Sequence, residues 1–335
     1  MSANACLFLF AAAVLVSGPV AGPAAAAPAA QSESSRDVER LYDAGLYQQA
    51  VKVLRAGIAN HPLDASLHDT LGRCFYQLGD FGNAISSLEK AVELDPGRSE
   101  YRDWLGKAYG RKAEESNPLS ALSLAGKTHR EFAEAVRLNP SNLAAQRDLI
   151  RYLLNSPGIV GGGQDRADAQ VRALTIVDGV EGALALAEAY ATRKKFDLAD
   201  QEYRKILESH SRRIGVDMEI AEYYRDQGDG QHMEQAVAEA AALNPSDIRL
   251  NYYRGVALVI SEKDAERAER LLRAYLDAAP DNSELPSRAS AREWLGRLYE
   301  QEHKLDSAAE EYQAGLALDP RSKTLREALK RMQKK

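Results

Sequence analysis

Helical runs along this chain of 335 residues end in one recurring pattern, an apolar residue followed by Asp-Pro or Asn-Pro. The pattern closes runs at residues 94–96, 138–140, 243–245 and 318–320. Proline cannot continue the hydrogen-bond ladder of a helix, so each copy predicts a helix end. The regular recurrence predicts an array of helical hairpins, an architecture that favours a binding surface over a reaction centre.

Small and aromatic residues recur between these ends with a period of 34 residues. Gly106 lies 34 residues after Gly72, and Tyr109 lies 34 residues after Phe75. Glycine in the first helix of a hairpin lets the second helix approach closely, and the aromatic side chain fills the space between the two. The residues assigned to this repeat framework are Gly72, Phe75, Ala84, Pro96, Gly106, Tyr109, Pro140, Gly255, Gly296, Tyr299 and Pro320.

The framework resembles the tetratricopeptide repeat (TPR), which places Leu-Gly-x-x-Tyr in its first helix, and Ala and Pro later in a unit of about 34 residues. The segments Leu71-Gly72-x-x-Phe75 and Leu105-Gly106-x-x-Tyr109 show the match most clearly. The resemblance implies an all-α, right-handed superhelical TPR solenoid of about eight hairpins over residues 35–320. A short amphipathic run at 324–332 predicts a C-terminal capping helix.

The N-terminus differs in kind, because residues 1–30 contain no charged side chain. An apolar run at 6–16, followed by Gly-Pro and an Ala-rich stretch, is typical of a secretory signal peptide. Export to the periplasm of a Gram-negative bacterium is therefore expected. An uncleaved membrane anchor is the alternative, although the run is shorter than the roughly 20 residues of a spanning helix. The predicted segments after the leader are an N-terminal array at 31–155, a Gly-rich insertion loop at 156–166 and a C-terminal array with the capping helix at 167–335.

Composition narrows the possible chemistry. A net charge of −6 without a long basic run argues against a nucleic-acid partner. Removal of the leader leaves one cysteine, Cys74, which is expected to be a buried apolar filler. The six histidines show no metal-ligand spacing, and no nucleophile motif or paired-carboxylate constellation stands out among the 49 acidic residues. We expect no metal, no cofactor, no catalytic residue and no membrane span after the leader.

The segment Pro157–Gly163 is the most unusual stretch of the sequence. A Gly-rich loop before a helix is one way to bind phosphate, but this loop lacks the Gly-Lys-Ser/Thr motif and a preceding strand. The favoured interpretation is an elongated turn between the two helices of one repeat. A lip that contacts a partner is the alternative.

By resemblance, one face of the first helices lines a concave groove, and this groove is the candidate binding site. The predicted partner-binding residues are Arg73, Tyr76, Lys107, Arg111, Arg147, Arg151 and Tyr252. Its cations between residues 73 and 151 predict a basic stretch suited to a protein or peptide partner, an acidic one among the options. The alternative is that these charges pair with one another, for example Lys107 with Asp103 one helical turn earlier.

The predicted function is that of a non-catalytic exported scaffold or adaptor, which binds protein or peptide segments in the groove. A component of the machinery that assembles or exports outer-membrane protein or polysaccharide is the alternative. A glycan-binding protein or an enzyme with its site at Gly158–Gly163 is a third hypothesis. Nothing in the sequence sets the oligomeric state.

Overall fold

The computed structural model describes residues 36–280 and 285–332, and eight consecutive helical hairpins occupy this part of the chain. A helix at 36–43 pairs with α2 (Tyr47–Asn60) to form the first hairpin. The first helices of the next seven hairpins are α3 (Ala65–Gln77), α5 (Ser99–Glu114), α7 (Leu143–Asn155), α9 (Gly179–Thr192), α11 (Ile214–Gln227), α13 (Arg249–Ile260) and α15 (Arg288–Gln301). Their second helices are α4 (Phe81–Leu94), α6 (Pro118–Leu138), α8 (Gln164–Val177), α10 (Phe196–Glu208), α12 (Gly230–Leu243), α14 (Ala265–Ala278) and α16 (Leu305–Leu318).

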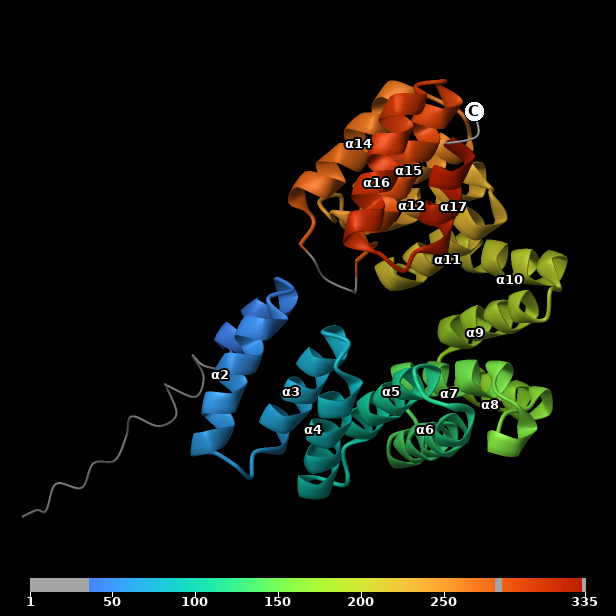
Figure 1. Cartoon of the computed structure of the whole chain (residues 1–335). Coiled ribbons are helices and arrows are strands. Elements are labelled where there is room, and N and C mark those ends of the chain that lie inside the picture. Colours follow the sequence, from blue (N-terminus) through green and yellow to red (C-terminus); the bar gives the residue numbers. More distant parts are fainter. Residues whose placement is uncertain (1–35, 281–284, 333–335) are drawn as a thin grey trace, which may run out of the picture.

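The hairpins stack into an arc in which the first helices line the inner side and the second helices the outer side (Figure 1). Helix α17 (Lys323–Met332) packs on α16 and covers the last hairpin with Leu325 and Ala328. The expected all-α solenoid of about eight hairpins with a capping helix is confirmed. The predicted leader at residues 1–30 lies outside the described residues, and no helix described here has the length and apolar character to cross a bilayer.

Helix boundaries follow from local chemistry. Asp64, Asp80 and Asn117 precede α3, α4 and α6, and each side chain accepts a hydrogen bond from a backbone N–H of the first turn. Such caps satisfy donors that the helix itself leaves without a partner. At the other end, Pro96 and Pro140 stand two residues beyond the last helical residue of α4 and α6. The Leu-Asp/Asn-Pro pattern therefore marks helix ends, as predicted.

The framework glycines stand where two helices touch. A Cβ placed on Gly72 would lie 2.5 Å from Cγ of Leu88, and one on Gly106 would lie 2.7 Å from the ring of Phe132. The equivalent positions Gly255 and Gly296 would clash with Leu272 and Tyr312 in the same way. The predicted role of these residues as close-approach points is confirmed.

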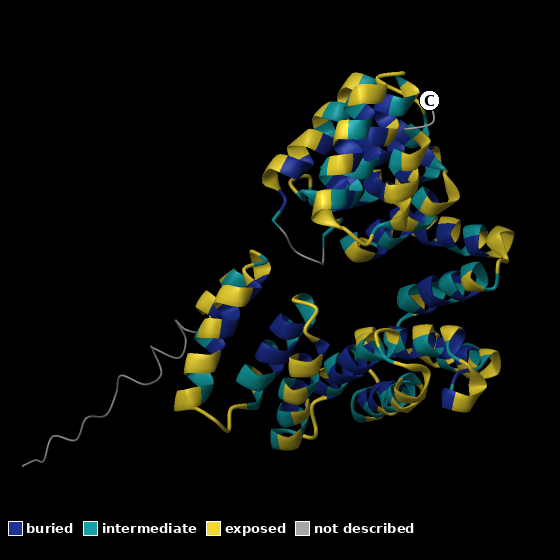
Figure 2. Cartoon of the chain, in the orientation of Figure 1, coloured by how far each residue is buried: buried dark blue, intermediate teal, exposed yellow. Residues whose placement is uncertain are grey.

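Among the described residues, the core is spread along the stack in four hydrophobic clusters rather than gathered in one centre, as expected of a solenoid. Buried residues run through the contact between the helices of each hairpin and between neighbouring hairpins (Figure 2). The framework residues Phe75, Ala84, Tyr109 and Tyr299 are all buried. Cys74 is fully buried, and burial raises the pKa of its thiol to about 12, so it serves as the predicted apolar filler.

The Gly-rich segment lies between α7 and α8, the two helices of one hairpin, as predicted, but it forms a compact turn rather than an elongated one. Residues Gly158–Val160 make a single 3-10 turn, η1, and α8 already begins at Gln164, so the turn ends earlier than the predicted loop. The Tyr152 hydroxyl lies 2.8 Å from the carbonyl oxygen of Ala125 in α6 and 2.7 Å from that of Val160, which ties the turn to the neighbouring hairpin. One hydrophobic cluster includes residues of both α7 and α8, so packing continues across this turn.

Candidate functional site

A cavity of about 660 Å³ lies on the inner side of the arc, in the N-terminal half of the array. Five successive first helices, α3, α5, α7, α9 and α11, contribute its walls. The lining residues are Tyr76, Gln77, Trp104, Lys107, Leu143, Ala144, Arg147, Asp148, Arg151, Glu181 and Glu219. Of the seven predicted partner-binding residues, the structure brings Tyr76, Lys107, Arg147 and Arg151 together at this cavity.

The first helices present two different columns of side chains. Residues three positions before the small framework residue are buried between neighbouring first helices, as Asp69, Asp103 and Tyr252 show with exposures of 6%, 3% and 0%. Residues one position after it reach the inner surface, and Arg73 and Lys107 have side-chain exposures of 32% and 24%. Of these two columns, the second is the more accessible to a ligand.

The prediction that Tyr252 lines the groove is therefore wrong for this conformation. Its ring packs against Tyr253 and Tyr275, and its hydroxyl lies 2.7 Å from the Ser290 hydroxyl on α15. The side chain belongs to the joint between α13 and α15, because its position on α13 faces the next first helix rather than the groove.

The cations of the cavity are paired with carboxylates. Lys107 Nζ lies 2.7 Å from Asp103 and 3.0 Å from Asp148, which comes from the next first helix. The alternative that Lys107 pairs with Asp103 is thus confirmed. Burial raises the pKa of the Asp103 carboxyl despite the opposing charge of Lys107.

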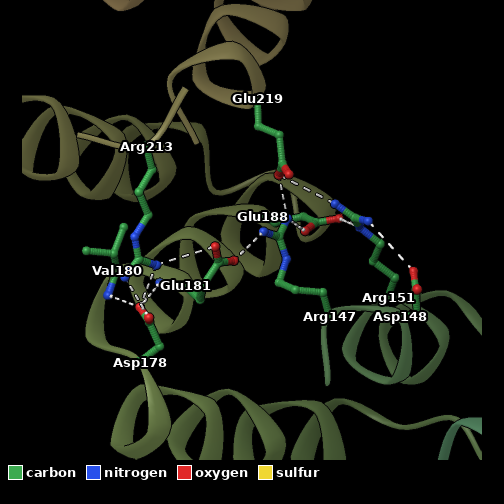
Figure 3. Close-up of polar contacts among 9 residues, drawn as sticks. All are labelled: Arg147, Asp148, Arg151, Asp178, Val180, Glu181, Glu188, Arg213 and Glu219. Atoms are coloured by element: carbon green, nitrogen blue, oxygen red, sulfur yellow. Dashed lines mark hydrogen bonds and ion pairs between the residues drawn. The ribbon is translucent and has the colours of Figure 1, made fainter. Parts of the chain in front are cut away.

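Arg147 is the centre of the network. Its guanidinium contacts Glu181 at 3.1 Å, Glu188 at 3.0 Å and Glu219 at 2.6 Å, and its side chain is only 8% exposed (Figure 3). Burial alone would lower the pKa of this guanidinium, but the three carboxylates hold it above its ordinary value. Arg147 is therefore a structural cross-link between α7, α9 and α11 in this conformation, rather than a free cation.

Arg151 extends the network toward solvent. It contacts Glu188 at 2.7 Å and Glu219 at 3.5 Å, and it approaches Asp148 at 3.8 Å (Figure 3). At the opposite end, Arg213 contacts Asp178 at 2.7 Å. The ion pairs thus connect neighbouring repeats along the inner surface from α5 to α11.

The inner surface is consequently not the basic stretch that the sequence predicts. Seven carboxylates face five cations in the ion pairs that run from α3 to the start of α11. The sequence alone does not reveal this balance of charges, because partners such as Arg147 and Glu219 are 72 residues apart. Arg111 stands apart from the cavity, paired with Glu114 at 2.6 Å and placed over the ring of Phe81.

An aromatic pair gives the cavity its apolar surface. The rings of Tyr76 and Trp104 meet edge to face with centroids 5.5 Å apart. Arg73 and Lys107 lie over the Trp104 ring at 4.8 Å and 4.6 Å from its centroid. Trp104 is not among the predicted site residues. Its place on a first helix, one turn before Ala108, is the sequence signal that could have predicted it. Aromatic rings beside hydrogen-bonding cations are typical of surfaces that bind polypeptide segments.

A second cavity, of about 670 Å³, lies on the inner side of the C-terminal half. Trp294 and three arginines, Arg225, Arg297 and Arg331, are among its lining residues. Arg297 and Arg331 pair with Glu293 at 2.6 Å and Glu300 at 3.3 Å, so this surface also balances its charges internally. Within the residues that the structure describes, no group of His, Cys, Asp and Glu has the arrangement of a metal site.

Comparison with known proteins agrees with this architecture. A tetratricopeptide repeat family model matches residues 38–99 and 264–323. The Hsp70-Hsp90 organising protein of Plasmodium falciparum is 33% identical over 112 residues, which cover 33% of this chain and 40% of that protein. The intraflagellar transport protein 70A of Bos taurus is 27% identical over 150 residues, which cover 43% of this chain and 23% of that protein.

Among solved structures, that of the yeast Tom70 matches 94% of this chain and 66% of its own, with a TM-score of 0.64 and 15% sequence identity. The chain thus has the all-α superhelical fold of tetratricopeptide-repeat proteins. The chain spans less than half the length of the two relatives named above, so these matches define its repeats and its fold.

Proposed function

We propose that this protein is an exported, non-catalytic scaffold that binds segments of other proteins on the inner side of its arc. The observation that carries the proposal is the cavity of about 660 Å³ between five successive first helices, with Tyr76, Trp104 and Arg151 at its surface. The name of the matched Hsp70-Hsp90 organising protein describes the organisation of other proteins, which supports the same class of function.

The chemistry of the cavity indicates the kind of segment that fits. Its cations already have carboxylate partners, so an acidic segment gains no advantage from net charge. Arg151 keeps a side-chain exposure of 43% and has hydrogen-bond donors to offer beyond its ion pairs. We therefore propose an extended segment of mixed polarity, which packs an apolar side chain on Tyr76 and Trp104 and places backbone carbonyls near Arg151.

Export is the second part of the proposal, and it rests on the uncharged, Ala-rich residues 1–30. Fractionation of cells that express the full chain, with mass spectrometry of its N-terminus, tests this part alone. A mature N-terminus near residues 27–30 in the periplasmic fraction is expected. Full-length protein in the cytosol or in the membrane would contradict it.

The binding proposal is tested by filling the cavity without removing a contact. Ala144 lies in the cavity wall and is exposed, so Ala144→Trp occupies the space while the ion pairs stay intact. Ala169 is an exposed alanine on α8, outside the cavity, and Ala169→Trp is the matched control. Affinity capture from the host's envelope extract should recover partners with wild type and the control but lose them with Ala144→Trp. Equal recovery by all three proteins would exclude the cavity as the binding site.

A further inference from the structure

The junction between α10 and α11 differs from every other junction in the described array. Each other pair of consecutive helices packs side by side, from α2 with α3 to α16 with α17. The backbones of α10 and α11 hardly approach one another, and the neighbouring first helices α9 and α11 also lack the packing that joins α7 to α9. In Figure 1, α9 and α10 stand between the lower part of the arc, which ends at α8, and the upper part, which begins at α11.

The connection at this junction has a left-handed backbone. His210 and Arg212 have φ angles of 46° and 56°, a pattern that the turn before α14 shares at Glu262 and Asp264. The buried hydroxyl of Ser211 between them has no hydrogen-bond partner in the protein. Backbone hydrogen bonds join the start of the connection to α10, and His210 lies 2.9 Å from Glu239 of α12, but no side chain caps the first turn of α11.

Side-chain contacts still hold the junction together. Residues of α10 and α11 share one hydrophobic cluster, in which the ring of Tyr203 packs on Tyr223 with centroids 4.2 Å apart. The Tyr224 hydroxyl also donates a hydrogen bond of 2.9 Å to Asp200 of α10. On the inner side, Glu219 of α11 reaches back to Arg147 at 2.6 Å and Arg151 at 3.5 Å, both on α7 (Figure 3). Arg213, just before α11, holds Asp178, just before α9, at 2.7 Å.

We propose that the segment 209–213 is a hinge between the sub-arrays at 36–208 and 214–332, and that Glu219 is the latch that holds it closed. The hydrophobic cluster shared by α10 and α11 is the pivot, because apolar packing has no directional requirement and tolerates small rotations. The ion pairs on the inner side are partly exposed, so salt or a competing charge weakens them.

The latch also forms part of the cavity described above. Glu219, Arg147 and Arg151 all line it, so rotation about the hinge moves the α11 wall away from the α7 wall. Opening therefore widens the inner surface at the place where a polypeptide segment would enter. The hinge stands whether or not the cavity binds a partner, and its test uses no partner.

Distance measurement between the two sub-arrays tests the latch. Ser86 on α4 and Gln313 on α16 are exposed, so spin labels at Ser86→Cys and Gln313→Cys report on both parts in a Cys6→Ser background. Cys74 is fully buried and stays unlabelled. Double electron–electron resonance should show a longer mean distance and a broader distribution for Glu219→Gln than for wild type.

The fold tolerates this variant, because Glu219 is 42% exposed on its side chain and Arg147 keeps Glu181 and Glu188 as partners. Wild type should shift in the same direction in about 1 M salt, which shortens the Debye length to about 3 Å. Glu134→Gln removes an exposed pair with Arg137 within α6 and serves as the control, with no expected shift. Identical distributions for wild type and Glu219→Gln at low and high salt would overturn the hinge.

Discussion

Gly106 shows how one residue sets the spacing of a hairpin. A Cβ at this position would lie 2.7 Å from the ring of Phe132, and the ring has no free space to move into because it is buried. We predict that Gly106→Ala destabilises the protein by about 1–3 kcal/mol through this overpacking. A Cβ added at Gly126 on α6 would have no neighbouring atom within 4 Å. Gly126→Ala should therefore be neutral, or stabilise the protein by roughly 0.5–1 kcal/mol. Urea unfolding of both variants measures the difference, and equal stability of the two would contradict the account.

Arg147 is the residue on which three repeats depend for charge balance. Removing its guanidinium leaves Glu181, Glu188 and Glu219 without their shared partner in a mostly buried site. We predict that Arg147→Met costs about 3–5 kcal/mol of unfolding free energy. The matched Arg137→Met change breaks a surface pair in which the Arg137 side chain is 67% exposed, and its unfolding free energy should not differ measurably from that of wild type. A small effect of both changes in chemical unfolding would show that the network is not structural.

Asp69 gives the fold a pH dependence of defined sign. Burial raises the pKa of its carboxyl from 3.8 to about 6, and Arg73 offsets this only in part. The folded state therefore binds the proton more tightly than the unfolded chain, so this side chain stabilises the fold below about pH 4 and loses that contribution as pH rises through 6.

The titration of Asp69 is tested with a variant that does not ionise. The free energy of unfolding of Asp69→Asn, relative to that of wild type, should rise by on the order of 1–3 kcal/mol from about pH 4 to pH 7.5. The reason is that the neutral amide has no buried charge to form. Urea unfolding at both pH values provides the measurement. A stability difference between the two proteins that stays constant with pH would refute the assignment.

At the scale of elements, the turn η1 shows that a Gly-rich segment can be well held. Its contact with the neighbouring hairpin depends on the Tyr152 hydroxyl, which lies within hydrogen-bond distance of Ala125 and Val160. Tyr152→Phe should therefore raise amide exchange at Gly161 and Gly162 by an amount corresponding to about 1 kcal/mol. Exchange in α3 and α16 should not change. Unaltered exchange in the turn would mean that glycine packing alone holds it.

The hairpins were predictable from the sequence, because each depends on residues within one unit of about 34. Gly72, Pro96 and the capping residues act on neighbours a few positions away or on the partner helix of the same hairpin. The groove was predictable only in part. The exposure of Arg151 and the burial of Tyr252 depend on how successive first helices rotate against one another, and no local pattern encodes that rotation.

At the scale of the whole molecule, the stack turns a row of local hairpins into one long inner surface (Figure 1). Ion pairs between repeats cover much of that surface, including the Arg147–Glu219 pair that joins residues 72 positions apart. Such a surface offers a ligand aromatic contact and hydrogen bonds rather than a strong net charge. The proposed function therefore requires that a polypeptide binds at the cavity beside Tyr76 and Trp104.

Photo-crosslinking from the cavity wall tests this claim most directly. A benzophenone amino acid replaces Ala144 in one sample and Ala169 in another, and each protein is irradiated in the cells that express it. Mass spectrometry then identifies the adducts. The account predicts that peptides of a partner protein are joined to position 144 and are absent, or far weaker, at position 169. No polypeptide adduct at position 144, or the same adducts at both positions, would contradict it.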